Sequence, residues 1–131
     1  MLKPAEIQVR FADCDMMGHV NNAVYLSYFE MARMHYFEQL VGAEWDYQKH
    51  GTLLVKNEVV YLKPVLLNDT PKIFVHLERI GEKSFTFGYT VKVNDEVRTT
   101  GSSKLVCFDF KTQSTVKVFP SFIEAFQKLD Q

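Results

Sequence analysis

The stretch "RFADCDMMGHVNNAVYLSYFE", residues 10–30, contains the change of backbone pattern that decides the fold. Just before it, residues 6–11 alternate apolar and polar side chains, which predicts a half-buried strand. After a polar loop, apolar residues recur every three or four positions, which predicts a helix over residues 23–41 that stops at Gly42. Because the apolar residues cover more than one stripe of this helix, we expect it to be buried on several sides.

The pattern changes to a period of two after residue 51 and keeps that period almost to the end of the chain. Strands are predicted in four segments, residues 52–64, 72–80, 84–93 and 98–110. Short connections rich in Asn, Asp, Gly and Pro separate them, which favours an antiparallel sheet. A final apolar pattern predicts a terminal helix with Ser121 as its cap.

One strand, one long apolar helix and four strands is an α+β order. A twisted antiparallel sheet of five strands can curl around a single helix and bury it, which is the arrangement of the hotdog fold. Residues 1–131 fit a single domain of this kind. Such a sheet leaves an edge strand, and pairing of edges across a two-fold axis would cover it. We therefore expect at least a dimer, either a homodimer or a homotetramer.

Composition excludes several classes of function. The chain has 15 basic and 16 acidic residues and a formal net charge of −1, so it lacks the positive field of a nucleic-acid-binding protein. No apolar run reaches the roughly 20 residues of a membrane span, and the start of the chain lacks a signal-peptide pattern. Cys14 and Cys107 form no CxxC pair, which indicates a reducing compartment. We expect a soluble cytoplasmic protein without a cofactor, a nucleic-acid partner or a membrane partner.

The loop between the first strand and the long helix holds the residues that could take part in a chemical reaction. Asp15 lies on this loop, and Gly18 allows a sharp turn. Asn21 and Asn22 are good residues to begin a helix, where backbone N–H groups are unpaired and face negative charge. A carboxylate beside amide donors suits acyl transfer, because the carboxylate attacks or activates water while the amides hold the developing oxyanion.

Each of these residues also has a structural interpretation. Asp15 is of a type that commonly shapes turns, and Asp13 is more readily explained as structural than as catalytic. His19 either orders the turn or lines an acyl pocket. Asp13, Asp15 and His19 could be read as metal ligands, but three candidates on one loop without a fourth are weak evidence, so no metal is predicted. Cys14 lacks a base partner and is a poor nucleophile candidate.

The segment "FADCDMMGHVNNAVYLSYFEMAR" resembles the opening signature of hotdog-fold acyl-CoA thioesterases of the 4-hydroxybenzoyl-CoA thioesterase family. The segments "VYLKPVLLND" and "RIGEKSFTFGY" resemble that family's second strand with its proline turn and its Gly-x-Lys-Ser hairpin. The resemblance extends over about residues 5–110, and the Asp-x-x-Gly-His-Val-Asn-Asn string is its most specific motif. It implies a hydrolase that cleaves an acyl-CoA to a free acid and CoA.

The resemblance also implies roles for individual residues. Asp15 takes the place of the catalytic aspartate, as a nucleophile or as a general base on water. The backbone N–H of Asn22 takes the place of the group that polarises the thioester carbonyl. Some branches of the family have a histidine at that position; this chain has one at His19 instead, where it would help to bind substrate. The Lys83–Ser84 hairpin matches a region that contacts CoA, often from the neighbouring subunit.

Two further side chains complete the predicted substrate site. Tyr25 lies close enough in sequence to the loop to line the pocket, and Val59 is expected near the acyl group along the dimer seam. The identity and length of the acyl group stay open, as does a choice between CoA and an acyl carrier protein.

Two other functions remain open at this point. The first is a hotdog hydratase or dehydratase, in which Glu30 or His35 of the helix would approach the substrate. The second is a noncatalytic protein that binds acyl thioesters, because one fold serves many functions. Glu30 is otherwise expected to pair with Arg33 three positions later.

Overall fold

The structure, a computed structural model, describes residues 2–42 and 45–130. Its elements follow the predicted order of one strand, one long helix, four strands and a terminal helix, with a short sixth strand added. They are β1 (Ala5–Glu6), α1 (Val24–Val41), β2 (Gly51–Tyr61), β3 (Lys72–Ile80), β4 (Ser84–Val93), β5 (Glu96–Asp109), β6 (Ser114–Thr115) and α2 (Pro120–Phe126). None of the helices in the described ranges is long and apolar enough to cross a membrane.

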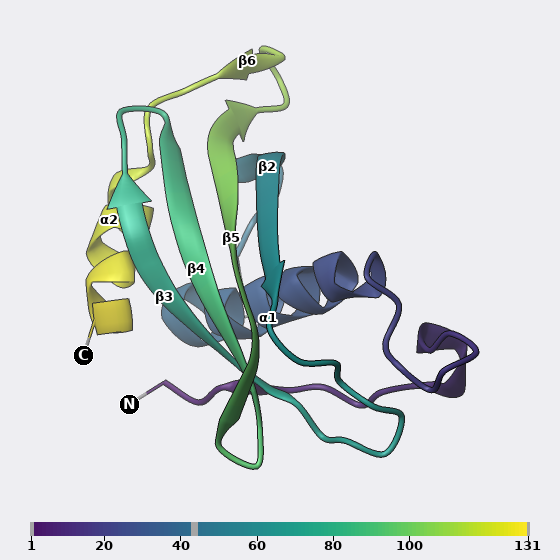
Figure 1. Cartoon of the computed structure of the whole chain (residues 1–131). Helices are drawn as coiled ribbons and strands as arrows, with labels where there is room; N and C mark the ends of the chain where they lie inside the picture. The colour runs from purple at the N-terminus through teal and green to yellow at the C-terminus, as the bar shows by residue number, and fades with distance from the viewer. Residues whose placement is uncertain (1, 43–44, 131) are drawn as a thin grey trace.

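The strands form one antiparallel sheet in the order β1-β3-β4-β5-β2, with β6 paired to the far end of β5. Figure 1 shows α1 running across one face of this sheet and α2 lying beside β3. The predicted α+β hotdog fold is therefore confirmed. The sheet differs from the predicted five strands only by the two-residue β6. β2 is an edge strand, and so is the very short β1.

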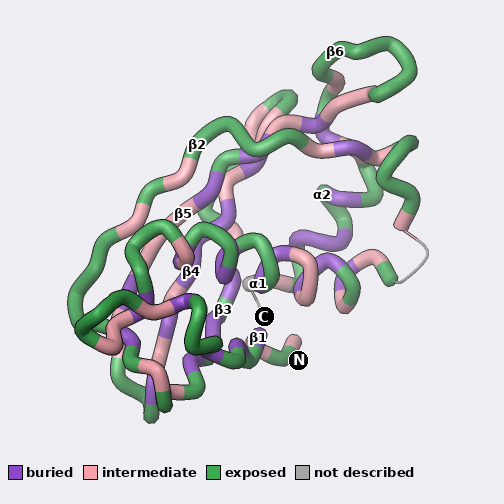
Figure 2. The backbone as a smooth tube through the Cα atoms, turned by 90° about the vertical axis from the view of Figure 1, so that its right-hand side faces the viewer, coloured by how far each residue is buried: buried purple, intermediate pink, exposed green. Residues whose placement is uncertain are grey.

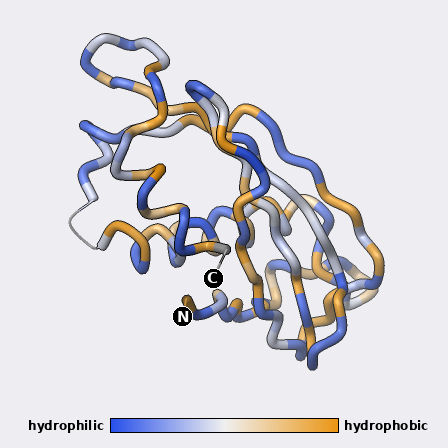
Figure 3. Tube along the Cα trace, turned by 90° about the vertical axis from the view of Figure 1, so that its left-hand side faces the viewer, coloured by the Kyte–Doolittle hydropathy of each residue, from blue (hydrophilic) through white to orange (hydrophobic). Residues whose placement is uncertain are grey.

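The core lies between the inner face of the sheet and α1. Alternate residues of β4 are buried, as the period of two predicts, and α1 adds a buried aromatic face. Figure 2 shows buried residues recurring along β3, β4 and β5, and Figure 3 shows hydrophobic and hydrophilic residues alternating along the strands. The outer side of α1 is not covered within the protomer, because Met31 is 51% exposed. Burial of the helix on several sides is therefore wrong for the protomer alone.

Two predicted boundaries are also wrong. The first strand pairs only over Ala5–Glu6, although Ile7 and Val9 keep its alternating burial. Phe11 is exposed because the chain turns there into a short 3₁₀ helix. Ser121 does not cap α2, because that helix begins at Pro120, whose fixed φ suits the first helical position.

Arg33 does not pair with Glu30. Its side chain turns toward the sheet and is almost fully buried, while Glu30 faces solvent. One guanidinium nitrogen, Nη1, donates to the Tyr89 hydroxyl at 3.1 Å and to Ser103 Oγ at 3.2 Å. Spacing along a helix can place two charges near each other, but the buried hydroxyls of the sheet decide where this guanidinium lies.

The close approach of α1 to the sheet depends on Gly101 of β5. The Phe29 ring stacks on Tyr89 of β4, with centroids 4.2 Å apart. The edge of the same ring lies over Gly101, where an added Cβ would stand 2.6 Å from a ring carbon and 2.7 Å from the carbonyl oxygen of Glu58. Glycine is therefore required here by the space between helix and sheet.

The substitution Gly101→Ala should lower the free energy of unfolding by about 2 kcal/mol, because overpacking moves the helix or forces a strained rotamer. Urea denaturation followed by circular dichroism measures the change. Ser102→Ala, one residue along the strand on the opposite face, is the control and should change stability by less than about 0.5 kcal/mol. Equal stabilities for the two variants would contradict the packing argument.

The loop that precedes α1 is held by a buried carboxylate. Asp13 accepts hydrogen bonds from the backbone N–H of Arg10 at 3.0 Å, from the Arg10 guanidinium at 2.8 and 3.1 Å, and from the Tyr28 hydroxyl at 2.7 Å. The hydrogen bond from the Arg10 side chain is the main cause that lowers the Asp13 pKa from 3.8 to about 2. Burial and the bond to Asp13 raise the pKa of Tyr28. Asp13 thus ties the loop to the second turn of α1, a structural role as predicted.

Asp13→Asn should lower the free energy of unfolding at pH 7 by about 2 kcal/mol, because it removes a buried charged acceptor. The folded-state pKa of Asp13 is depressed, so its contribution is present above pH 3.8 and is lost as the pH falls toward about 2. Chemical denaturation at pH 7 and at pH 3 should therefore give a smaller difference between parent and variant at the lower pH. A stability difference between parent and variant that does not change with pH would contradict the proposed contribution of the Asp13 charge.

Candidate active site

Asp15 lies on a narrow loop closed by its own hydrogen bonds. Its backbone N–H donates to the carbonyl of His19 at 2.8 Å, and its Oδ1 accepts the N–H groups of Met17 at 2.9 Å and His19 at 3.2 Å. Gly18 adopts a φ of 75° in this turn, as predicted from its lack of a Cβ. Within residues 2–42 and 45–130, no donor reaches the second carboxylate oxygen, Oδ2. One oxygen therefore shapes the loop, and the other keeps its capacity to accept a hydrogen bond.

The start of α1 offers fewer open amides than expected. The N–H of Asn21 donates to the Asp13 carbonyl, that of Ala23 to the Asn21 side chain, and that of Val24 to the Asn21 carbonyl, each at 2.8–2.9 Å. The N–H of Asn22 meets no acceptor among the described residues. Asn21 thus caps the turn before the helix, and the Asn22 N–H stays available as a donor beside the positive end of the helix dipole.

A single cavity of about 260 Å³ brings these groups together. It is lined by Asp15, His19, Val20, Asn22 and Tyr25 from the loop and the first turn of α1, and by residues 61–64 from the end of β2. Four of the seven predicted site residues therefore meet in one protomer, namely Asp15, His19, Asn22 and Tyr25. An exposed carboxylate, an imidazole and an open amide beside an apolar wall form a place where a carbonyl group can be attacked and polarised.

The other three predicted residues lie elsewhere in the protomer. Val59 is half-buried on β2, two residues before the cavity wall, and does not line the cavity. Lys83 and Ser84 lie at the turn between β3 and β4, which Figure 1 shows far from the loop that carries Asp15. Ser84 lines a different cavity, of about 330 Å³, together with Glu58 and residues of β3 and β5.

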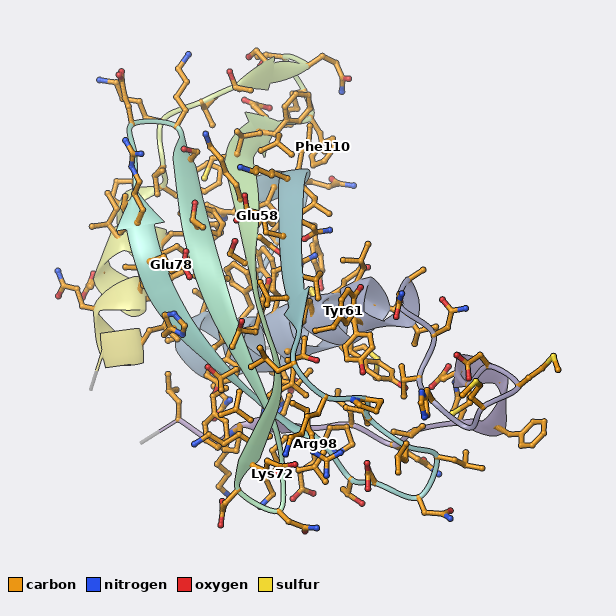
Figure 4. The ribbon with its side chains drawn as sticks, in the orientation of Figure 1. Glu58, Tyr61, Lys72, Glu78, Arg98 and Phe110 are labelled. Carbon is orange, nitrogen blue, oxygen red and sulfur yellow. The ribbon has the colours of Figure 1, made fainter. Side chains whose placement is uncertain are left out.

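The sequence analysis did not assign residues 61–64 to the site, although they form one wall of the cavity. The Tyr61 hydroxyl donates to the Asn22 carbonyl at 2.7 Å, and its ring meets the Tyr25 ring edge-on at 5.1 Å. Figure 4 shows Tyr61 at the end of β2 beside α1. The available signal was Pro64, the predicted end of this strand, although β2 ends three residues earlier at Tyr61. Only the sheet topology reveals that this end lies against the start of the helix.

Two negative expectations concern the chemistry of the loop. Burial, with Asp13 and Asp15 nearby, raises the pKa of the Cys14 thiol, which disfavours the thiolate that a cysteine nucleophile needs. In the part of the chain that the structure describes, no three His, Cys, Asp or Glu side chains cluster in a way that could hold a metal ion.

Comparison with known proteins shows the family of the chain. Residues 9–126 match the family model of the thioesterase-like superfamily. The chain is 29% identical to the long-chain acyl-CoA thioesterase FadM of Escherichia coli (strain K12) over 114 residues, which cover 85% of this chain and 86% of FadM.

Two solved structures are similar over nearly the whole chain. A thioesterase from Thermus thermophilus, solved with coenzyme A and Zn, is 33% identical with a TM-score of 0.85, over 98% of this chain and 93% of that one. A DHNA-CoA thioesterase from Staphylococcus aureus is 26% identical with a TM-score of 0.84, over 98% and 90% of the two chains. By its sequence and its fold, the chain belongs to the thioesterase-like superfamily.

Proposed function

We propose that this protein hydrolyses the thioester bond of an acyl-CoA, with Asp15 as the reacting carboxylate and the Asn22 N–H as the oxyanion donor. The observation that carries the proposal is the 260 Å³ cavity, which Asp15 and Asn22 both line. Among the described residues no donor reaches Asp15 Oδ2 and no acceptor reaches the Asn22 N–H. The similarity to a thioesterase solved with coenzyme A supports CoA as the leaving group.

Two routes fit this geometry. As a general base, Asp15 takes a proton from water while the oxygen of that water bonds to the thioester carbon. The C–S bond then breaks and the CoA thiolate takes up the proton. As a nucleophile, Asp15 itself bonds to the carbon, releases the thiolate and leaves a mixed anhydride that water hydrolyses. In both routes the carbonyl oxygen becomes negative, and the Asn22 N–H and the helix dipole stabilise it.

The remaining predicted residues fit this proposal in different ways. His19 and Tyr25 line the cavity and would contact the thioester and the first carbons of the acyl group. Val59 would contact the acyl chain farther along β2. Lys83 and Ser84 do not line this cavity, and we propose that they contact the CoA phosphates from a second subunit.

The edge of the sheet supports a homodimer. β2 runs for 11 residues as an edge strand and exposes a row of apolar side chains, namely Leu53, Leu54, Val55, Val60 and Tyr61. A long apolar edge of this kind invites pairing with another strand. Antiparallel pairing of β2 with β2 of a second copy would cover this edge and extend the cavity wall across the seam.

The hydratase alternative gains no support from the protomer. It requires Glu30 or His35 to face the substrate, and neither lines the cavity. The His35 Nε2 instead lies 3.1 Å from the Lys3 carbonyl oxygen, next to the N-terminal segment.

Asp15→Asn should reduce hydrolysis by about three orders of magnitude or more, because the amide can neither attack nor take a proton. Release of free CoA thiol from short, long and aromatic acyl-CoAs measures the effect and identifies the preferred acyl group. Asp46→Asn is a matched control, because its Oδ1 also accepts the N–H two residues on, from Gln48 at 2.9 Å. If the Asp15→Asn variant hydrolysed acyl-CoA as fast as the parent, the proposed role of Asp15 would be ruled out. If the parent hydrated an enoyl-CoA without releasing thiol, the hydratase would be favoured.

The dimer makes a separate prediction. In analytical ultracentrifugation the parent should sediment with at least twice the mass of one chain. Val60→Lys should shift it toward the monomer, because a charge on an edge strand opposes pairing. Val60→Ala keeps the edge uncharged and should leave the mass unchanged. A parent that is monomeric at every concentration would refute the dimer.

A further inference from the structure

We propose that Tyr61 is a positioning residue, whose hydroxyl holds Asn22 in the orientation that makes its N–H an effective oxyanion donor. This inference rests on the proposed function and names a residue through which the site is assembled. The Tyr61 hydroxyl donates to the Asn22 carbonyl at 2.7 Å, across 39 positions of sequence, and both residues line the same cavity.

Tyr61 belongs to a reciprocal pair of tyrosines. Tyr61 reaches from the strand to the start of the helix, and Tyr25 reaches back from the helix, where its hydroxyl accepts the N–H of Val65 at 3.2 Å. The carbonyl of Val65 in turn accepts the N–H of Val20 at 2.8 Å. These hydrogen bonds thus join the loop, the start of the helix and the end of β2 to one another. Among them, the bond from Tyr61 is the one that reaches Asn22 directly.

The Asn22 residue is held on both sides of its open amide. On the N-terminal side, the N–H of Asn21 is bound by the Asp13 carbonyl at 2.8 Å. On the C-terminal side, the carbonyl of Asn22 is bound by Tyr61. An oxyanion donor is effective when it is oriented before the reaction, so that it does not reorganise as charge develops. Without the Tyr61 hydroxyl, the peptide group that follows Asn22 keeps only the bond from the Ala23 N–H to the Asn21 side chain.

The Tyr61 hydroxyl is suited to a permanent structural bond. Burial and the neighbouring Tyr25 raise the pKa of Tyr61, so it remains a protonated donor at neutral pH. The Asn22 carbonyl accepts the hydrogen bond from this hydroxyl in the absence of substrate. Tyr61 therefore acts through Asn22 and does not donate a proton to the substrate.

The test is Tyr61→Phe, which keeps the ring against Tyr25 and removes only the hydroxyl. We expect kcat for the preferred acyl-CoA to fall about 10- to 100-fold, the loss that follows from a slightly misplaced catalytic group, while KM stays within about twofold. The melting temperature should stay within about 3 °C of the parent, because the lost bond is partly exposed. The pH profile of kcat/KM should keep its shape.

Tyr47→Phe is the matched control. Tyr47 is exposed and lies beyond the opposite end of α1, a helix of 18 residues that spans about 27 Å. This variant should keep the kcat and KM of the parent.

Other outcomes overturn the inference in distinguishable ways. A Tyr61→Phe kcat within twofold of the parent, with Asp15→Asn inactive, refutes the role of Tyr61 and leaves the proposed function standing. Loss of an alkaline limb of the pH profile would make Tyr61 a proton donor to the substrate, contrary to the proposal. A fall in kcat accompanied by a melting temperature more than 10 °C lower would assign the effect to unfolding. A parent that hydrolyses no acyl-CoA refutes both proposals together.

Discussion

The position of α1 against the sheet is the constraint on which the rest of the molecule depends. Its aromatic face is buried on the concave side of β4 and β5, and the Phe29 ring fits against the sheet only because Gly101 has no side chain. Once the helix is placed, its first turn necessarily stands beside the end of β2. The Asp13 carboxylate then ties the preceding loop to Tyr28 on the same helix.

The order of the elements and the main contents of the site could be predicted because they depend on short-range patterns. A period of two, a period near 3.6 and a glycine after the helix predict strands and a helix without knowledge of the rest of the chain. Asp15, Gly18 and Asn22 are likewise neighbours in sequence, so a single loop and a helix start suffice to bring them together. The Asp15 loop has the sharp turn at Gly18 that was expected.

What could not be predicted depends on contacts between distant segments. Arg33 has a carboxylate at helical spacing, yet its guanidinium binds hydroxyls from β4 and β5, which the helix pattern does not contain. Tyr61 lies in an ordinary alternating strand, and only the pairing of β2 with β5 carries it to the start of the helix. The number of unpaired backbone N–H groups at the helix start could not be predicted from the sequence either, because Asn21 accepts hydrogen bonds through both its side chain and its carbonyl.

The long sequence separation of the Tyr61–Asn22 bond bears on the order in which the protein folds. Local contacts such as those of Asp13 and Asp15 can begin to shape residues 10–28, whereas the wall formed by residues 61–64 and the bonds to Val65 arrive only when the sheet closes, since such distant pairings form late. A partly folded chain would therefore already carry the acid and the amide, but in an open, water-filled setting. Completion of the cavity coincides with completion of the fold.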